Sequence, residues 1–163
     1  MEKVINLHIP HVGEKIFENI HSDDLIEWFK VSKTWKVLAE NVLLKRWKSK
    51  MIEACQRGKF EIVKLLLERT DTKLNTTDNQ GGTALMWACY NGHKDVVQLL
   101  LNSSDKDIEL NKRNNRGLTA FRLACYNGHK DVVQLLLNSS DKDIELNTRN
   151  TRGRTAFMAA SYN

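Results

Sequence analysis

The sequence predicts an all-α protein, in which a short stack of repeated helix pairs, joined by β-turn and hairpin loops, follows an N-terminal helical segment. Three observations support this. A 24-residue stretch, ACYNGHKDVVQLLLNSSDKDIELN, occurs unchanged at Ala88–Asn111 and Ala124–Asn147. Thr83, Thr119 and Thr155 each open a Thr-Ala dipeptide at intervals of 36 residues. Within each copy the apolar residues recur at helical spacing. Self-similarity at such a period is typical of a solenoid.

Each copy predicts two helices. The Thr83 hydroxyl can cap the first one, in which Leu85, Ala88 and Cys89 share one face, and Gly92 suits the left-handed conformation that ends a helix. The second helix, KDVVQLLLN, is apolar nearly all round, so we expect it to be buried between its neighbours. Polar loops containing NQGG, NNRG and NTRG then turn the chain into the next copy.

A fourth, diverged copy, SKMIEACQRGKFEIVKLLLE, precedes the others, with Gly58 at the place of Gly92. We therefore expect an N-terminal domain at residues 1–47 and a repeat domain at 48–163. The repeats themselves are expected at about 48–80, 81–115 and 116–151, with a truncated copy at 152–163.

Composition and charge exclude several classes of protein. Hydrophobic residues make up 41% of the chain and charged residues 28%, and neither a membrane-spanning run nor a secretory leader is apparent. The net charge of +5 comes from interleaved cations and anions, so we do not expect a nucleic-acid partner. We expect a cytoplasmic location, with the nucleus as the alternative.

No catalytic or cofactor motif is apparent, so we expect a protein that is not an enzyme, with no catalytic residue, metal ligand or cofactor. Cys55, Cys89 and Cys125 occupy one repeat position, and we interpret them as small buried core residues. His93 and His129 recur with the repeat and are interpreted as structural.

The repeat resembles the ankyrin repeat, whose usual core reads T-P-L-H-x-A-A-x-x-G-H-x-x-V-V-x-x-L-L-L and here becomes TALMWACYNGHKDVVQLLL. The resemblance runs from about Trp47 onward. Ala replaces the Pro, and Met86, Arg122 and Met158 replace the first His, so we expect the hydrogen bond that this His supplies to be missing.

Ankyrin stacks bind other proteins through the hairpin tips and the exposed side of the first helices. The resemblance implies these target-binding candidates: Asn79, Gln80, Trp87, Tyr90, Asn91, Asn115, Arg116, Leu118, Tyr126, Asn127, Arg152 and Arg154. The copies differ just before the identical run, at Gly82/Leu118, Leu85/Phe121, Met86/Arg122 and Trp87/Leu123. We expect target specificity to lie in this variable band and in the hairpins.

The N-terminal segment predicts three helices: one near Val12–Asn19, a second capped by Ser22/Asp23 and a third after Ser32. Ile9-Pro10, Ile16-Phe17, Asp24-Leu25-Ile26 and Val31 to Trp35 resemble the F-box, although the gap from Pro10 to Ile16 is one residue short. The F-box implies binding to the Skp-type adaptor of a cullin–RING ubiquitin ligase. The adaptor-binding candidates that it implies are Ile9, Pro10, Ile16, Phe17, Leu25, Val31 and Trp35.

Three functional hypotheses remain open. The combination resembles an F-box/ankyrin-repeat substrate receptor, whose N-terminus binds the ligase while the repeats bind a target protein. The alternative is a plain ankyrin scaffold whose N-terminal helices only cap the solenoid. A third hypothesis is a nucleic-acid binder that uses hairpin cations, namely Lys112, Arg113, Arg116, Arg149, Arg152 and Arg154.

Two further expectations concern the joint and the end of the chain. Only KSK separates Trp47 from Met51, so we expect one rigid body, which NMR relaxation would test. The last copy stops at GRTAFMAASYN, so we expect a fragment or truncated copy of a longer array. Residues from about Thr155 should then fray, because so short a helix is marginal without packing.

Overall fold

The structure is a computed structural model that describes residues 21, 22, 24, 37, 39, 40, 42, 43, 47, 50–68, 72–103, 108–139, 144–155 and 158. The chain divides into two compact units, residues 1–48 and 49–163. In the second unit the described residues form six α-helices and no strand. They are α4 (Met51–Gln56), α5 (Phe60–Leu67), α6 (Ala84–Tyr90), α7 (Lys94–Leu101), α8 (Ala120–Tyr126) and α9 (Lys130–Asn138).

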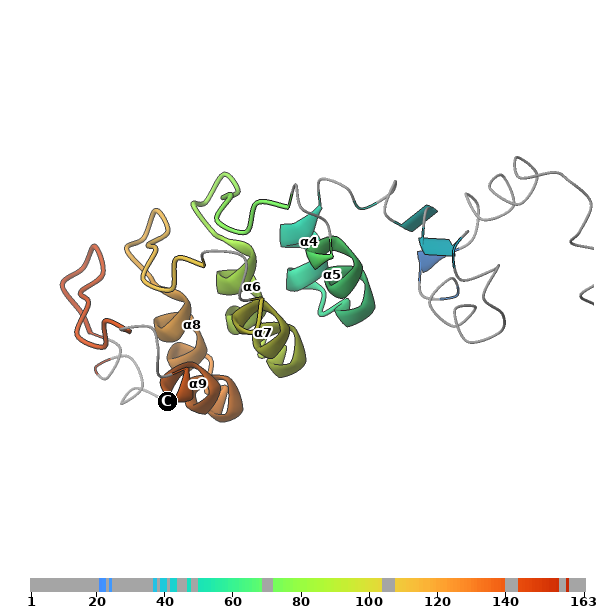
Figure 1. Ribbon diagram of the computed structural model, residues 1–163. Coiled ribbons are helices and arrows are strands. Elements are labelled where there is room, and N and C mark those ends of the chain that lie inside the picture. The colour runs from blue at the N-terminus through green and yellow to red at the C-terminus, as the bar shows by residue number, and fades with distance from the viewer. Residues whose placement is uncertain are drawn as a thin grey trace, which may run out of the picture. The chain divides into compact units, whose positions relative to one another are not determined.

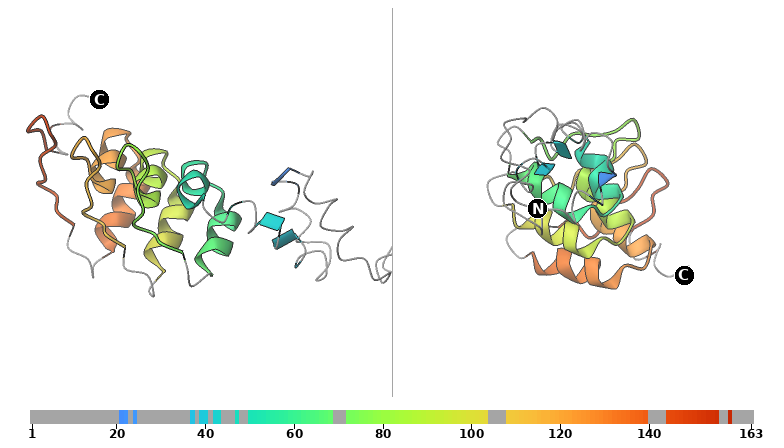
Figure 2. Two further views of the ribbon diagram at one scale, coloured as in Figure 1. Left: turned by 90° about the horizontal axis from the view of Figure 1, so that it is seen from above. Right: turned by 90° about the vertical axis from the view of Figure 1, so that its right-hand side faces the viewer.

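These helices form successive pairs, α4 with α5, α6 with α7 and α8 with α9, as the sequence predicts (Figure 1). The first helices of the pairs make one layer, in which α6 packs between α4 and α8. The second helices make another layer, in which α7 packs between α5 and α9 (Figure 2). The repeat unit is therefore a helical solenoid two layers thick.

The predicted caps set the ends of the first helices. The Thr83 hydroxyl accepts a hydrogen bond from Met86 N–H at 3.2 Å, and the Thr119 hydroxyl accepts one from Arg122 N–H at 3.4 Å. Gly92 and Gly128, at φ +73° and +70°, turn the chain into the second helix. The same short signals thus begin and end equivalent helices.

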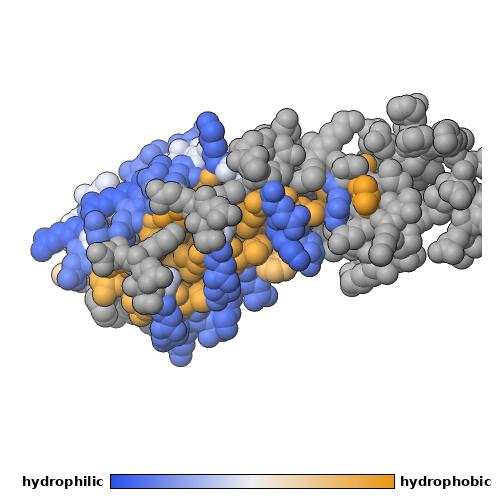
Figure 3. All heavy atoms as spheres, in the orientation of Figure 1, coloured by the Kyte–Doolittle hydropathy of each residue, from blue (hydrophilic) through white to orange (hydrophobic). Residues whose placement is uncertain are grey.

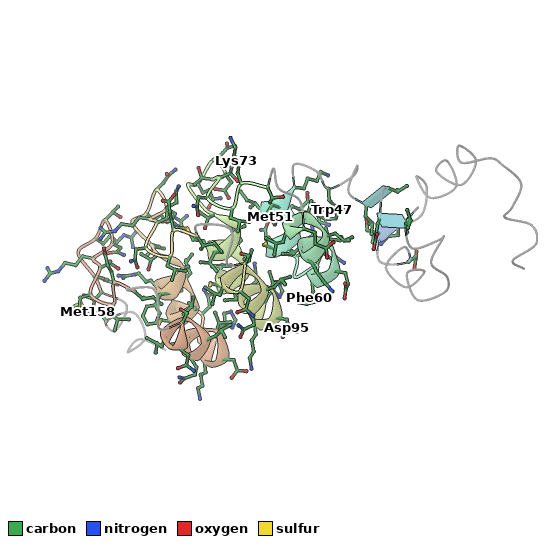
Figure 4. All side chains as sticks on the ribbon, viewed as in Figure 1. Trp47, Met51, Phe60, Lys73, Asp95 and Met158 are labelled. Carbon is green, nitrogen blue, oxygen red and sulfur yellow. The ribbon has the colours of Figure 1, made fainter. Side chains whose placement is uncertain are left out.

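The second helices are amphipathic, so the prediction that they are buried nearly all round is wrong. In α7 the buried residues are Val96, Val97 and Leu100, whereas in α9 Leu137 is 46% exposed. The reason is the two-layer architecture, because only one side of this layer meets other helices. Figure 3 shows hydrophilic residues over the hairpin loops and along the outer side of the helices, with hydrophobic residues between these two bands. Figure 4 likewise shows Lys73, in the loop after α5, on the opposite side of the helices from Asp95 of α7.

Histidine side chains tie consecutive copies together. His93 Nε2 lies 3.0 Å from the Gln56 carbonyl oxygen, and His129 Nε2 lies 2.9 Å from that of Tyr90. Asparagines add to these contacts, since the Asn75 side chain accepts from Glu109 N–H at 3.0 Å and Asn111 accepts from Glu145 N–H at 2.9 Å. The repeating hydrogen bonds confirm that both histidines have a structural role.

Arg122, which stands where the ankyrin pattern has its first His, forms hydrogen bonds to the loop that follows α9. Its Nη1 donates to the Thr148 carbonyl at 3.3 Å and also to the carbonyl of Arg154. Its side chain is only 3% exposed. The expectation that this hydrogen-bonding link is missing is therefore wrong for this copy, because a guanidinium reaches carbonyls of the next loop instead.

In the first unit, the described residues give a partial view. Ala39, Val42, Leu43 and Trp47 are buried, and Trp47 Nε1 donates to the Ser22 hydroxyl at 3.2 Å. Ser22 itself lies within a helix and is buried, rather than standing before the helix as predicted. The adaptor-binding candidates, Ile9, Pro10, Ile16, Phe17, Leu25, Val31 and Trp35, all lie outside the described residues.

Candidate functional site

The three loops that precede first helices carry hairpins of one conformation, at residues 78–82, 114–118 and 150–154. In each hairpin a single side-chain oxygen accepts two backbone N–H groups. Asp78 Oδ1 accepts from Gln80 and Gly82, both at 2.8 Å, and Asn114 Oδ1 accepts from Arg116 and Leu118, both at 3.0 Å. Asn150 repeats the arrangement with Arg152 and Arg154. These local bonds fix the tips from which the predicted binding residues project.

The hairpins are also bonded to one another. Asn115 N–H donates to the Gln80 carbonyl at 3.0 Å, and its side-chain amide donates to the Asn79 carbonyl at 3.1 Å. Thr151 N–H donates to the Arg116 carbonyl at 3.2 Å. The loops therefore stack in register along one side of the helices (Figure 1).

Two adjoining hollows lie between the hairpins and the first helices. The first, of about 380 Å³, is lined by Asn79, Gln80, Gly82, Met86, Trp87, Tyr90, Asn114, Asn115, Arg116, Leu118 and Leu123. The second, of about 950 Å³, is lined by Tyr90, Arg116, Leu118, Arg122, Leu123, Tyr126, Asn150, Thr151, Arg152 and Arg154. Because the two share four lining residues, they form one continuous groove.

Aromatic and apolar side chains characterise the first hollow. The rings of Trp87 and Tyr90 meet edge to face, with their centroids 5.6 Å apart and their planes at 75°. Met86, Leu118 and Leu123 add apolar surface beside them. This hollow thus offers ring faces and aliphatic carbon, together with the amides of the hairpins and one cation, Arg116.

Asp78 holds the Trp87 ring in place, because Trp87 Nε1 donates to Asp78 Oδ2 at 2.7 Å. Burial acts to raise the pKa of the Asp78 carboxyl, but hydrogen bonds from Gly82 N–H, the Trp87 indole and Gln80 N–H together lower that pKa below its ordinary value. The carboxylate is thus negative at neutral pH, and it both shapes the hairpin and orients the ring.

The second hollow is cationic. Four arginines line it, Arg116, Arg122, Arg152 and Arg154, and the residues that line either hollow include no Asp or Glu. Tyr90 and Tyr126 lie beside them and are 42% and 57% exposed. The groove therefore changes along its length from a mixed aromatic, apolar and amide lining with one arginine to a basic lining with four.

Of the twelve target-binding candidates, ten line the two hollows. The exceptions are Asn91 and Asn127. The Asn91 side chain donates to the carbonyls of Gln56 at 3.2 Å and Trp87 at 3.1 Å, and the Asn127 side chain donates to the Leu123 carbonyl at 2.8 Å. Because these amides bond to helix ends, they have a structural role in the solenoid.

The variable band falls mostly in the groove. Three of its four pairs, Gly82/Leu118, Met86/Arg122 and Trp87/Leu123, line one hollow or the other. The fourth pair, Leu85/Phe121, is buried in the helix layer. Met86, Arg122 and Leu123 were not among the binding candidates, although the difference between the two copies marked all three positions.

The cysteines do not form a site. Cys55 and Cys89 are buried, and Cys125 is partly buried; none is in a disulfide. Within the described part of the chain, His, Cys, Asp and Glu nowhere gather in threes as they would to hold a metal ion. No helix there is long and apolar enough to cross a bilayer.

Two of the cations proposed for nucleic-acid binding are paired with carboxylates. Lys112 Nζ lies 3.4 Å from Glu109 Oε1, and Arg113 Nη2 lies 3.4 Å from Glu145 Oε2. Arg116, Arg152 and Arg154 line the second hollow instead. The six cations therefore do not form one uniform basic stripe.

Comparison with known proteins adds a family match that covers most of the chain. The family model described as Ankyrin repeats (3 copies) matches residues 22–113 and 106–163. Its match begins at residue 22, within the segment for which we predicted an F-box.

Relatives among curated proteins match a shorter part of the chain. Osteoclast-stimulating factor 1 of Monopterus albus is 43% identical over 58 residues, which are 36% of this chain and 27% of the relative. That of Xenopus laevis is 45% identical over 49 residues, which are 30% of this chain and 22% of the relative. Acyl-CoA-binding domain-containing protein 6 of Danio rerio is 35% identical over 54 residues, 33% of this chain and 18% of the relative. The chain spans about a quarter or less of the length of these relatives.

Proposed function

Since this chain belongs to the ankyrin-repeat family, we propose that its groove binds a segment of another protein, so that the chain works as a protein–protein interaction module. The observation that carries the proposal is where the two near-identical copies differ. From Ala88 to Asn111 and from Ala124 to Asn147 they are the same, and three of the four differing pairs that precede these runs line the groove. A shared scaffold with a varied lining is what recognition of a target requires.

The groove also has the residue types that favour binding. Trp, Tyr and Arg are the commonest hot-spot residues of protein interfaces, and all three line it. The stacked hairpins and the helix layer hold these side chains on a rigid frame, which lowers the entropic cost of binding. These properties support a site that is formed before the partner arrives.

A pull-down with the full chain as bait tests this function. The double variant Tyr90→Ala/Tyr126→Ala removes two exposed rings from the groove. Lys94→Ala/Gln98→Ala, on the exposed side of α7, is the matched control. Proteins retained by wild type and control but lost from the groove variant are its targets. If all three baits retain the same proteins, the groove is not the binding site.

A second candidate function, substrate receptor of a Skp–cullin–F-box type ubiquitin ligase, rests on the N-terminal segment. The spacing of Ile9-Pro10, Ile16-Phe17, Leu25 and Val31 to Trp35 supports it. The start of the ankyrin match at residue 22 supports the alternative, in which these helices only cover the first repeat. The relatives that match are not F-box proteins.

Binding of the purified full chain to a Skp-type adaptor separates these two possibilities. A complex at micromolar concentration that is lost on Ile16→Asp, but kept with Tyr90→Ala, supports the receptor. If the wild-type chain forms no complex, the receptor function is excluded, and the alternative is retained in which the N-terminal helices only cap the repeats.

A further inference from the structure

We propose that the groove selects a bipartite segment of its partner protein, in which an apolar side chain enters the first hollow and Asp or Glu carboxylates enter the second, about three residues along. The inference rests on the proposed protein-binding function and specifies the chemistry of the partner. It comes from the unequal lining of two hollows that otherwise repeat one architecture.

The aromatic pair of the first hollow, Trp87 and Tyr90, favours an apolar residue. The indole N–H of Trp87 is already bonded to Asp78, so the ring presents carbon surface to a ligand. Met86 and Leu123 complete an apolar wall. The negative charge of Asp78, 2.7 Å from the indole nitrogen, disfavours an acidic or phosphorylated group at this end.

The second hollow favours carboxylates, and Arg122 is its fixed element. The Arg122 side chain is 3% exposed, and its two hydrogen bonds both leave from Nη1 to backbone carbonyls. A guanidinium has five N–H donors. No fully enclosed side-chain nitrogen or oxygen of the described residues lacks a partner, so the other two nitrogens of Arg122 keep at least a small exposed surface. Arg116, Arg152 and Arg154 surround the same hollow.

Charge complementarity identifies the occupant. The residues lining this hollow include no carboxylate, and Glu145, which lies outside it, pairs with Arg113. Fork-shaped guanidinium groups bind carboxylates through paired, charge-assisted hydrogen bonds. A nucleic acid would also be attracted to the arginines, but its phosphates would approach the Asp78 carboxylate, which bonds to Trp87 of the first hollow. An acidic peptide with an apolar anchor therefore fits both ends.

The spacing follows from the repeat geometry. Neighbouring packed helices lie about 8–10 Å apart. An extended peptide advances about 3.3 Å per residue. About three residues of an extended segment therefore separate the apolar anchor from the first carboxylate.

The test uses the full chain and a displayed peptide library that is randomised at eight successive positions. We expect the selected peptides to share an aliphatic or aromatic residue and, two to four positions away, one or more Asp or Glu. One selected peptide is then synthesised with a fluorescent label, together with a version in which Gln replaces each Glu and Asn each Asp, and binding is measured by anisotropy.

Arg152→Glu is the diagnostic variant, and Arg149→Glu is its matched control, with an equal charge change on an exposed residue outside the groove. We expect Arg152→Glu to lower the affinity for the acidic peptide by about tenfold. Arg149→Glu should lower that affinity by less than about twofold. The neutralised peptide should bind to wild type about tenfold more weakly than the acidic peptide does. Its affinity for the Arg152→Glu variant should be no lower than its affinity for wild type.

The outcomes separate the two proposals. If the library yields no binding peptide, the proposed function itself fails. If peptides bind but lack carboxylates, or if both charge variants act alike, the groove binds protein and the bipartite inference is overturned. Displacement of the acidic peptide by a twelve-nucleotide oligothymidylate at equal concentration would overturn it in favour of a nucleic-acid site.

Discussion

The imidazole ring of His129 occupies the space that a side chain on Gly92 would need. A Cβ atom at Gly92 would come within 2.5 Å of His129 Nδ1, while Nε2 of the same ring lies 2.9 Å from the Tyr90 carbonyl oxygen. Gly92 also has φ of +73°, a conformation that disfavours other residues. Glycine is therefore required twice at this position, once by the backbone and once by the next repeat.

The first prediction compares Gly92→Ala with Gly128→Ala. Gly128 occupies the same place in the identical segment, has φ of +70° and has nothing within 4 Å of its Cβ position. Both variants should lose about 1 kcal/mol from backbone strain. Gly92→Ala should lose about 1 kcal/mol more because the ring must leave its hydrogen bond. Urea unfolding at equilibrium measures both, and equal losses would show that the ring moves aside freely. In a His129→Ala background the two glycine variants should become equivalent.

The second prediction concerns the pH dependence that Asp78 confers. Because its folded-state pKa is lowered, its contribution to stability is present above the unfolded pKa and is lost as the pH falls through the folded pKa. Trp87→Phe removes one of the stabilising donors, so the pKa of Asp78 should rise toward its ordinary value. The variant should be about 1 kcal/mol less stable than wild type at pH 7, and the difference should shrink in acid. Titration of the Asp78 carboxyl carbon by NMR is the direct measurement, and an unchanged pKa in the variant would contradict the assignment.

The third prediction concerns cysteine reactivity. Burial raises the pKa of Cys55 to about 12 and raises that of Cys89. Burial also raises the pKa of Cys125, although the Arg122 charge acts in the opposite direction. With iodoacetamide at pH 8, Cys125 should react in the native protein, and the other two only after unfolding. Peptide mass spectrometry identifies the sites. Equal labelling of Cys89 and Cys125 would contradict the prediction, because it would mean that the two thiols are equally accessible to the reagent.

The fourth prediction is that Arg122→Met loosens the hairpin at 150–154. Met86 is buried at the equivalent position, so methionine is compatible with the repeat. The variant loses the donors to the Thr148 and Arg154 carbonyls. The Gly153 amide donates to the Asn150 carbonyl at 2.9 Å. Its hydrogen exchange should be about fivefold faster in the variant, because the free energy of local opening falls by about 1 kcal/mol. The Gly81 amide of the first hairpin is the internal control and should not change.

The parts of the fold that depend on local interactions could be predicted from the sequence. The Thr83 cap joins groups three residues apart, and the left-handed Gly92 turn depends mainly on the absence of a side chain. Because each repeat is one local unit stacked on the next, the period alone is sufficient to place the helices.

The rest depends on contacts that are distant in the sequence. Arg122 is buried because carbonyls 26 and 32 residues further along accept its donors, and composition alone marks arginine as a surface residue. The sequence likewise did not indicate that the Asn91 amide bonds to the Gln56 carbonyl, 35 residues earlier. The number of apolar residues in α9 gave no indication that Leu137 faces water, because that depends on how many helix layers the solenoid has.

Successive hairpins are joined by the same type of backbone hydrogen bond. This regularity allows a chain of this kind to gain or lose a whole repeat during evolution. The identical segments start at Ala88 and Ala124, so an unequal crossing-over between their coding regions would add or remove 36 residues as a unit. In the shortened product, Trp87 would precede the segment that now follows Leu123, and its ring would face Arg152 and Arg154. The junction would use surfaces that already fit together, since His129 and His93 make the same contact with a preceding repeat. One recombination event could therefore produce a new combination of groove residues without a new fold.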